Sequence, residues 1–346
     1  MARRRTRWPI VAGVVVLCII TLVALAFGNG RVPRIGSVTR VTIPVGATLS
    51  DAADSLVSAR VIRSARVFLM VASITGGADG SVIPGRYRVP RGASASALLD
   101  QLHSGGNRFR RLVIPEGWGI GQIARLLRDS LGADTTEFLA ATRDSARRAR
   151  VQTPAADLEG YLFPATYEFT ADVTPAMAVD TMLTTFERRW KRAWDSVITV
   201  QGRTRHEVVT LASIVEREAG RDADRPLIAA VYLNRLRIGM RLQADPTVLY
   251  AMQLVAKRVM YADLRVMSPY NTYRVSGLPP GPIASPGTAS IEAVIAPATS
   301  DALFFVAFPD GHSQFTRTFT QHSAAVRAMR KARDSAAVAR PAVAPR

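Results

Sequence analysis

A run of uncharged residues near the start of the chain divides it into parts that must fold in different surroundings. It extends from Trp8 to Phe27 and follows four arginines among the first seven residues. A helix of about 20 apolar residues is long enough to cross a bilayer, and the arginines favour a cytoplasmic N-terminus. We therefore expect residues 1–30 to form a cytoplasmic stub and a transmembrane anchor, with the rest of the chain outside the membrane.

A cleaved signal peptide is the alternative for this segment, because Ala24, Leu25 and Ala26 resemble a signal-peptidase site. The apolar run is longer than a secretory core of roughly 7 to 15 residues, which favours an anchor that is retained. Cys18 lies in the middle of the run and follows Leu17 rather than a small residue, so it does not indicate a lipid-modified cysteine.

Composition narrows the chemistry available to the external part. Cys18 is the only cysteine, so no disulfide is expected there, and the four histidines show no metal-ligand spacing. We predict neither a metal nor a cofactor. The net charge of +18 comes mostly from arginines scattered along amphipathic helices such as residues 141–150. No basic strand carries interleaved aromatic residues, so we interpret the charge as solvated helix faces and do not expect nucleic-acid binding.

A short motif occurs three times in the first half of the chain. A β-branched residue precedes proline, and a Pro-x-Gly turn follows, at Val41–Gly46, Arg88–Gly92 and Val113–Gly117. The residue before proline favours an extended backbone, and a helical pattern follows each turn. The motif therefore predicts strand–turn–helix units, with helices at Leu49–Leu56, Ala95–Leu102 and Ile120–Leu131.

The remainder of the chain is mainly helical, with short strands. Helical patterns over 135–200 are interrupted by an aromatic segment at 157–169, and a strand is expected at Ala302–Phe308. We predict an α+β fold: a small α+β subdomain over 31–105, a larger mixed α/β domain over 106–322 and a basic Ala/Arg-rich tail over 323–346 that begins as helix and ends without structure.

One acid on a largely apolar helix is the candidate for catalysis. On a helix over Glu207–Gly220, Glu216 and Glu218 flank the apolar face from opposite sides. Glu218 has Arg221 at i+3, whereas Glu216 has only small or polar uncharged residues at those spacings. A carboxyl without a partner has its pKa raised by burial, which predicts that Glu216 is a general acid. The alternative is that Glu216 caps or bridges helices as an ordinary buried acid.

Polar residues downstream of this helix are candidates for binding a sugar. Asn234 and Arg235 lie on a second predicted helix, Asp224–Arg237, and Asp245 precedes a proline, which predicts an extended or turn conformation. Each of these side chains has an alternative role in bonding to its own loop or turn. The full set of candidate substrate-binding residues is Asn234, Arg235, Gln243, Asp245, Thr247, Tyr270, Asn271 and Tyr273.

Four motifs together resemble the YceG-like (MltG) family of membrane-anchored endolytic lytic transglycosylases of bacterial peptidoglycan. They are Ala212–Ala219, Val231–Thr247, Tyr270–Tyr273 and Gly277–Ile283. The resemblance extends from the anchor to about His322. It implies a LysM-like fold for residues 31–105 and a YceG-like catalytic domain for 106–322, and it places the family's catalytic glutamate on Glu216. Ala165 stands where the family pattern leads us to expect an acid.

The resemblance implies cleavage of the MurNAc–GlcNAc bond within glycan strands, which forms 1,6-anhydro-MurNAc ends and terminates strand elongation. It also implies an inner-membrane location with the catalytic part in the periplasm or otherwise outside the cytoplasm, and peptidoglycan synthases as partners. Two alternatives remain open: a hydrolytic muramidase in which Asp245 assists Glu216, and a non-catalytic membrane-anchored scaffold that binds peptidoglycan.

Overall fold

The structure, a computed structural model, describes residues 38–75, 81–90, 92–105, 109–170, 173–254 and 258–338. These residues form two compact units. The first contains the described residues up to Leu112 together with Tyr167–Val173, and the second contains Val113–Thr166 and the described residues from Thr174 onward. The predicted transmembrane anchor lies outside the described residues. Within the described ranges, no helix combines the length and apolarity needed to span a membrane.

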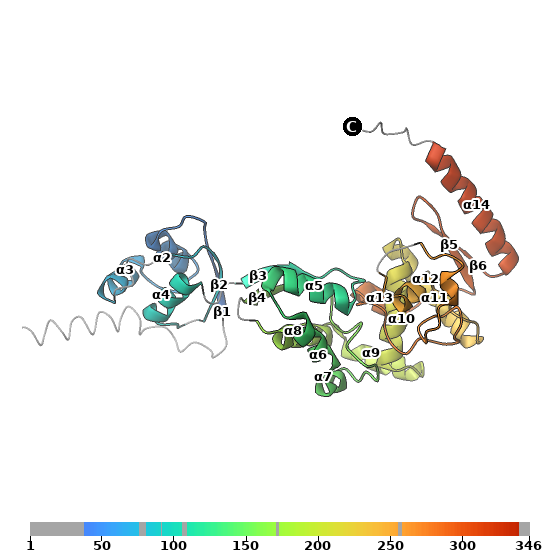
Figure 1. Ribbon diagram of the computed structural model, residues 1–346, viewed down its shortest axis with the longest axis horizontal. Coiled ribbons are helices and arrows are strands. Elements are labelled where there is room, and N and C mark those ends of the chain that lie inside the picture. The colour runs from blue at the N-terminus through green and yellow to red at the C-terminus, as the bar shows by residue number, and fades with distance from the viewer. Residues whose placement is uncertain are drawn as a thin grey trace, which may run out of the picture. The chain divides into compact units, whose positions relative to one another are not determined.

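The first unit is built on a pair of antiparallel strands with helices packed against one face. The pair is β1 (Val38–Ile43) and β2 (Gly85–Pro90), with Val41 opposite Tyr87. Because successive side chains of a strand point to opposite faces, alternate residues of both strands are buried and the others lie in solvent. The helices of the unit are α2 (Leu49–Ser58), α3 (Ala65–Ile74) and α4 (Ala95–Ser104), and Figure 1 shows them beside the two strands.

The three predicted strand–turn–helix units are confirmed. Each strand is followed by a turn whose glycine has positive φ: 78° at Gly46, 86° at Gly92 and 74° at Gly117. The third strand–turn–helix motif consists of β3 (Phe109–Val113) and α5 (Ile120–Leu131), and β3 pairs with β4 (Thr166–Thr170). Glycine adopts this backbone conformation at little cost, which explains the motif. The sequence did not predict α3, which lies between β1 and β2.

The second unit is mainly helical. Its first part packs around the aromatic residues Tyr161, Phe186, Trp190 and Trp194, whose rings meet edge-on or tilted at centroid distances of 5.1–5.9 Å. These helices are α6 (Thr135–Arg143), α7 (Ser145–Arg150), α8 (Pro175–Arg189) and α9 (Arg192–Val200). The sequence interpretation of the aromatics as core residues is therefore confirmed for Tyr161.

The candidate catalytic helix lies in the remaining part of the second unit. It is α10 (Arg205–Glu218), which begins with a capping box between Thr204 and Glu207 and packs against α11, α12 and α13. Figure 1 shows these four helices close together. The remaining elements are the short 3-10 helices η1 (Asp222–Asp224) and η2 (Asp263–Arg265), the helices α11 (Arg225–Arg237), α12 (Asp245–Ala251), α13 (Thr288–Ile295) and α14 (Phe319–Val338), and the antiparallel hairpin β5 (Phe304–Ala307) and β6 (Ser313–Thr316).

Two local predictions differ from the structure. Asp245 is not in an extended or turn conformation but is the first residue of α12, and Pro246 occupies the helix's first turn. Proline is tolerated there because the first amide groups of a helix have no partner within it. The predicted catalytic helix ends at Glu218 rather than Gly220, since Ala219 has an extended backbone. The mixed α/β class is confirmed. The described strands pair two by two, so each sheet that they form has two strands.

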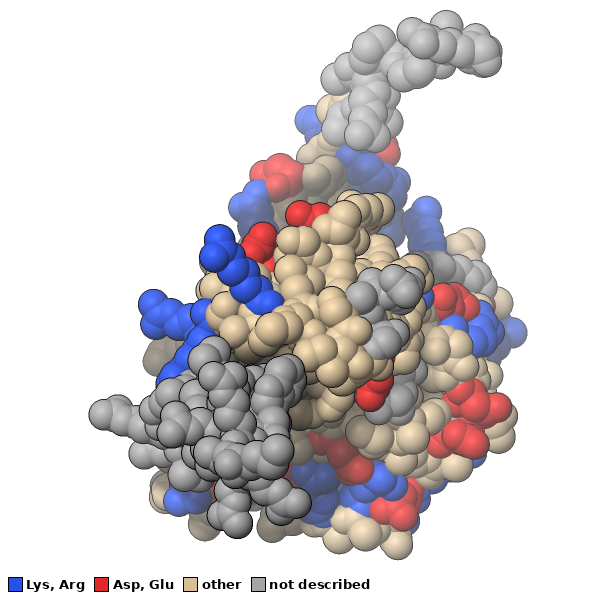
Figure 2. All heavy atoms as spheres, turned by 90° about the vertical axis from the view of Figure 1, so that its left-hand side faces the viewer, with Lys and Arg blue, Asp and Glu red and all other residues tan. Residues whose placement is uncertain are grey.

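Basic and acidic side chains are mixed on the surface (Figure 2), as expected if the basic helix faces lie in solvent. On the face shown in Figure 2, blue Lys and Arg side chains are interspersed with red Asp and Glu side chains, with uncharged residues between them. Several arginines of the second unit are paired on the surface, including Arg147 and Arg150 with Asp180. Pairing of this kind reduces the attraction of the basic faces for polyanions.

Candidate active site

The last turn of α10 points three charged side chains in different directions. Glu216, Arg217 and Glu218 are consecutive, and residues on an α-helix are separated by about 100°. Each side chain therefore meets a different set of neighbours. The two glutamates consequently differ in chemistry, although they are only two residues apart.

Glu216 bonds to three donors and also lies near the carboxyl of Glu116, whose pKa is raised by burial and by the charge of Glu216. Its Oε1 accepts a hydrogen bond from Arg225 Nη2 at 2.8 Å, and its Oε2 accepts bonds from the Gly287 amide at 2.9 Å and from Ser290 Oγ at 2.8 Å. Arg225 Nε also donates to Ser290 Oγ at 2.9 Å. The side chain of Glu216 is only 6% exposed and that of Arg225 8%.

The prediction that Glu216 lacks a cationic partner is therefore wrong. Arg225 begins the next helix, nine residues along the chain, and lies beyond the i+3 and i+4 spacings that the sequence reasoning considered. The buried ion pair and the two further donors hold the Glu216 side chain in one position. Through these bonds Glu216 connects α10 to α11 and to the N-terminus of α13, as the alternative interpretation of this residue described.

Glu218 has the properties that the sequence analysis assigned to Glu216. Burial raises its pKa to about 7, and the negative charge of Asp245 contributes in the same direction. The Tyr232 hydroxyl donates to Glu218 Oε1 at 3.1 Å, which lowers the pKa in part. Arg221, the predicted partner of Glu218, instead donates to the Asp310 carbonyl. Glu218 is thus a partly exposed carboxyl that is about half protonated near neutral pH.

Asp245 and Tyr273 complete what we call the acid cluster, which consists of Glu218, Tyr232, Asp245 and Tyr273. Tyr273 Oη donates to Asp245 Oδ1 at 2.6 Å. Burial raises the pKa of Tyr273, and its bond to Asp245 adds to the effect, so the phenol stays protonated and remains a donor. Asp245 is itself exposed, as is Gln243, whose backbone has a φ of 50°. The structure therefore brings two predicted binding residues, Asp245 and Tyr273, to Glu218 rather than to Glu216.

The two predicted binding residues on α11 bond to the protein's own backbone. Asn234 Nδ2 donates to the carbonyls of Ser300 and Ala302 at 2.8 and 3.1 Å. Arg235 is buried, donates from Nε to the Leu303 carbonyl at 2.7 Å and lies 5.3 Å from the ring centroid of Phe304. These contacts fix the segment before β5 against the helix.

Thr247 and Asn271 are also used inside the protein. Thr247 is fully buried, and its Oγ1 lies 2.6 Å from the Ala244 carbonyl and 2.9 Å from Thr272 Oγ1. Asn271 is fully buried and donates to the carbonyls of Leu264 and Val266. Both side chains shape the loop that carries Tyr270 and Tyr273.

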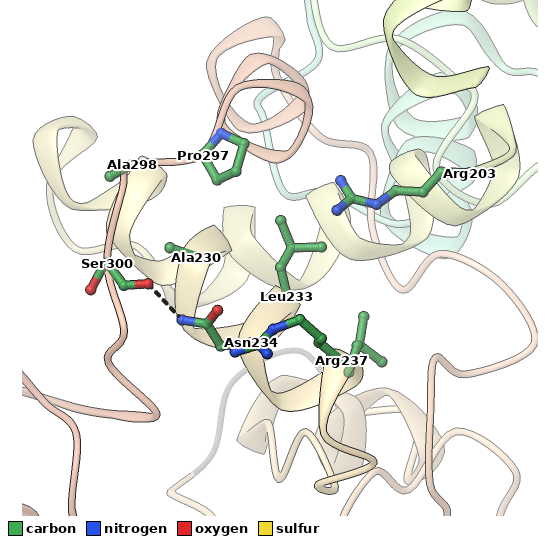
Figure 3. A pocket seen from close by; sticks show the side chains of 9 residues that line it. Arg203, Ala230, Leu233, Asn234, Arg237, Pro297, Ala298 and Ser300 are labelled. Carbon is green, nitrogen blue, oxygen red and sulfur yellow. Dashed lines mark hydrogen bonds between the residues drawn. The ribbon is translucent and has the colours of Figure 1, made fainter. Parts of the chain in front are cut away.

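A pocket of about 490 Å³ lies on the face of α11 opposite the one that carries Tyr232 (Figure 3). Asn234 and Arg237 line it together with Arg203, while the Asn234 side chain is held against Ser300. At 100° per residue, Asn234 and Arg237 project away from Tyr232 and Arg235. This pocket is therefore separated from the acid cluster by the helix itself.

A second pocket, of about 590 Å³, lies beside the acid cluster within the second unit. Two of its lining residues, Arg217 and Pro246, are the chain neighbours of Glu218 and Asp245. We call it the tyrosine pocket, because the rings of Tyr250 and Tyr270 line it with their centroids 4.8 Å apart. The other lining residues are Gly117, Gly119, Gly121, Gln122, Arg125, Leu139, Glu159, Leu249, Ala251, Gln253, Leu254, Ser268 and Ile283.

Glu159 is a residue of this pocket that the sequence analysis did not select. It is only 6% exposed, and burial raises its pKa to about 8, with the charge of Asp157 acting in the same direction. Both carboxyl oxygens accept from the Ile120 amide at the start of α5, at 3.1 and 3.3 Å. A signal was present in the sequence: Glu159 stands between Leu158 and Gly160 in an aromatic segment where an acid is unusual.

The described residues of the acid cluster and the tyrosine pocket do not form a metal site. Among the residues that the structure describes, no group of three or more His, Cys, Asp and Glu side chains has the arrangement of a metal site. The chemistry that these residues can support is proton transfer by Glu218, with hydroxyl and carboxylate groups nearby that can orient a polyhydroxylated substrate.

Comparison with known proteins finds relatives of this chain over most of its length. The model of the YceG-like family matches residues 41–328. A protein of Bacillus subtilis named endolytic murein transglycosylase is 34% identical over 308 residues, which cover 82% of this chain and 83% of that protein. A protein of the same name from Streptococcus pneumoniae is 33% identical over 300 residues, or 77% of this chain and 54% of the relative, so the chain spans about half the length of that relative.

A solved structure extends the comparison to the fold. The crystal structure of a yceG-like protein from Listeria monocytogenes superposes with a TM-score of 0.58 at 32% identity, and the match covers 83% of this chain and 99% of that one. The family match includes both units and every residue of the acid cluster. On this evidence, the chain belongs to the YceG-like family.

Proposed function

We propose that this protein is an endolytic lytic transglycosylase that cleaves the MurNAc–GlcNAc bond within peptidoglycan glycan strands and leaves 1,6-anhydro-MurNAc ends. The relatives named endolytic murein transglycosylase support the reaction class. The observation that carries the proposal is the environment of Glu218, whose pKa is raised to about 7 beside a phenol donor and a second carboxylate. Such a carboxyl can both give and take a proton near neutral pH.

Glu218 rather than Glu216 is the general acid in this proposal. The Glu216 carboxylate is occupied by Arg225, Gly287 and Ser290, and a glycosidic oxygen would have to displace one of these bonds to reach it. Breaking a buried ion pair is costly, because it leaves an uncompensated charge. Glu218 has the one side-chain donor described above, at Oε1, so its second oxygen is left to bond a substrate oxygen.

The reaction needs only one protein carboxyl. Glu218 in its acid form protonates the glycosidic oxygen as the bond to C1 of MurNAc breaks. The resulting carboxylate then takes the proton of that sugar's 6-hydroxyl, whose oxygen attacks C1 and closes the 1,6-anhydro ring. Since the attacking group belongs to the substrate, proximity replaces a protein nucleophile. The Glu218 proton is restored at the end of the cycle.

Asp245 and Tyr273 position the substrate in this scheme. The Tyr273 hydroxyl is committed to Asp245 Oδ1, which leaves Asp245 Oδ2 available to accept from a sugar hydroxyl. The exposed side chain of Gln243 adds an amide at the same edge. Asn234, Arg235, Thr247 and Asn271 support the site indirectly, by holding the segments that carry it.

A hydrolytic muramidase is the second candidate, because Asp245 is close enough to Glu218 to raise its pKa. In a hydrolase that uses two carboxylates, the second acts as a nucleophile or activates water. The products distinguish the two reactions, since each transglycosylase fragment with a MurNAc end is lighter by one water than the hydrolytic fragment.

The experiment is mass spectrometry of glycan strands digested by the full chain. We expect anhydro ends with the wild-type protein and a loss of at least about a hundredfold in rate with Glu218→Gln, since general acid catalysis contributes about 10²–10⁴-fold. Glu187→Gln, a surface acid paired with Arg150, is the control and should retain wild-type activity. Hydrolytic ends would favour the muramidase, and strands that bind without being cut would favour a non-catalytic scaffold.

The wider setting of the enzyme is also a proposal. We propose that residues 1–30 anchor the chain once in the inner membrane, with the N-terminus cytoplasmic and the catalytic part outside the cytoplasm, where it acts alongside peptidoglycan synthases. We assign the first unit a LysM-like role in holding glycan. The order β1, α2, α3, β2, with the two strands paired antiparallel, supports this assignment.

A further inference from the structure

The tyrosine pocket is a second feature of the catalytic unit with the composition of a ligand site. Its volume of about 590 Å³ lies within the range of small-molecule sites, roughly 300–1,000 Å³. Sites of this kind combine aromatic side chains with a few polar groups that fix the orientation of the ligand. The pocket has both, and the acid cluster does not account for them.

The aromatic part is formed by Tyr250 on α12 and Tyr270 on the following loop. Their rings are inclined at 49° and are partly exposed. Burial raises the pKa of Tyr270, and the charges of Asp157 and Glu159 add to it, so its hydroxyl stays protonated. Each of these phenols offers an apolar ring face with a hydrogen-bonding edge.

The polar part lies at the start of α5. Glu159 is buried there and accepts from the amides of Ile120 and Gly160, and its two oxygens have further lone pairs for another donor. Gln122 accepts from the Gly119 amide with its Oε1, so its amino group is left to donate. Gly119 has no side chain, and a Cβ at this position would lie only 3.2 Å from Glu159 Oε2.

The hydrogen-bonding groups Glu159, Gln122, Tyr250 and Tyr270 carry little charge near neutral pH. Glu159 is mainly protonated because its pKa is raised to about 8, and the charge of Asp157 adds to the raised pKa of both tyrosines, which stay protonated. These groups suit an uncharged ligand that forms hydrogen bonds. The exposed Arg125 lies at the rim, where a charged group attached to the ligand could remain in solvent.

We propose that the tyrosine pocket binds an uncharged N-acetylhexosamine ring of the glycan strand, with the ring against Tyr250 and Tyr270 and its hydroxyls bonded to Glu159 and Gln122. This inference rests on the proposed function for the nature of the polymer. Arg217 and Pro246 line the pocket while Glu218 and Asp245, one residue away on each segment, belong to the acid cluster.

The test uses N-acetylchitotetraose, an uncharged saccharide, and the full chain carrying Glu218→Gln so that no bond is cleaved. We expect Tyr250→Ala and Tyr270→Ala each to weaken binding about tenfold or more, as truncating a buried aromatic anchor does. Tyr261→Ala is the matched control, because Tyr261 is 86% exposed and does not line the pocket. Equal affinities for the pocket variants and the control would overturn the inference.

Footprinting with hydroxyl radicals tests the same site without any substitution in the pocket, in case an alanine variant fails to fold. N-acetylchitotetraose should protect Tyr250 and Tyr270 from oxidation and leave Tyr261 reactive. Protection of the two tyrosines by a free stem peptide and not by the saccharide would overturn the inference in favour of a peptide site. Because binding is measured without turnover, a failure of the proposed cleavage reaction would leave this result unchanged.

Discussion

The carboxyl of Glu218 has two neighbours that move its pKa in opposite directions. The charge of Asp245 raises it, and the hydrogen bond from Tyr232 lowers it. In the proposed reaction the protonated form of Glu218 cleaves the glycosidic bond, so the rate should fall about tenfold per pH unit above a pKa of about 7. Tyr232→Phe should move this alkaline limb to higher pH, and Asp245→Asn should move it to lower pH.

The measurement is the pH dependence of kcat for the full chain on purified glycan strands. A residue with a merely structural role would lower the rate at every pH and leave the limb in place. Shifts of the same sign in both variants would contradict the assignment of Glu218 as the acid. The matched control is Tyr261→Phe, which changes an exposed phenol and should not move the limb.

Glu159 makes the stability of the protein depend on pH. Its pKa is about 8 in the folded chain and about 4.3 in an unfolded one. The folded state therefore binds the proton more tightly, so this contribution is complete below about pH 4.3 and is lost as the pH rises towards 8. In Glu159→Gln, which cannot ionise, the free energy of unfolding should fall less between pH 5 and pH 8 than in the wild-type chain.

Urea unfolding at a series of pH values measures this difference, which amounts to on the order of 1.4 kcal/mol per pH unit between the two pKa values. The control is Glu137→Gln, because Glu137 is exposed in the first turn of α6. Parallel pH profiles for the wild-type chain and Glu159→Gln would show that Glu159 is ionised in the folded state.

The sequence predicted the helix that carries Glu216 and Glu218 but not the environment of each acid. Spacing within one helix predicted Arg221 as the partner of Glu218, and the structure pairs Arg225 of the next helix with Glu216 instead. Contacts between helices depend on how α10 and α11 pack, which periodicity does not specify. Asp245 and Tyr273 were selected from their types and context, and the structure places them at the same acid.

At the scale of the elements, Glu216 is a connection between three helices. It joins Arg225 at the start of α11 to Gly287 and Ser290 at the start of α13. Removing one partner of a buried ion pair typically costs about 3–5 kcal/mol, because the other charge is left without compensation. We expect Glu216→Ala to lower the free energy of unfolding by an amount in that range.

An exposed ion pair of the same unit provides the control. Lys191 and Glu292 are bonded on the surface, with side chains 60% and 45% exposed. Exposed pairs contribute about 0–1 kcal/mol, so Glu292→Ala should cost little. Chemical denaturation of both variants decides the comparison, and equal costs would contradict the bridging role of Glu216.

The elements themselves were largely predictable where local rules determine them. The glycine of each Pro-x-Gly motif adopts positive φ, which separates strand from helix within a few residues. The conformation of Asp245 was not predicted, because proline disfavours a helical residue before it and yet is accepted in a helix's first turn. In α12 the second preference prevails, with Pro246 and Val248 buried in the fold.

For the whole molecule, the division into two units predicts how the chain unfolds. The first unit has a core of its own, in which Val41, Leu56, Phe68, Tyr87 and Leu98 are buried together. The second unit has separate buried residues on its central helices, such as Ile228 on α11. Units that each bury a core of their own can unfold in separate steps.

Calorimetry of the full chain should therefore show two transitions that respond to different substitutions. Phe68→Ala removes a fully buried ring from the first unit and should lower only the transition of that unit, by about 3–5 kcal/mol in stability. Ile228→Ala should lower only the other, by about 2–5 kcal/mol. If either substitution shifts a single cooperative transition of the whole chain, the two units fold as one. Glycan cleavage supplies a second readout, since the acid cluster lies entirely in the second unit: Phe68→Ala should spare it at temperatures where the second unit remains folded.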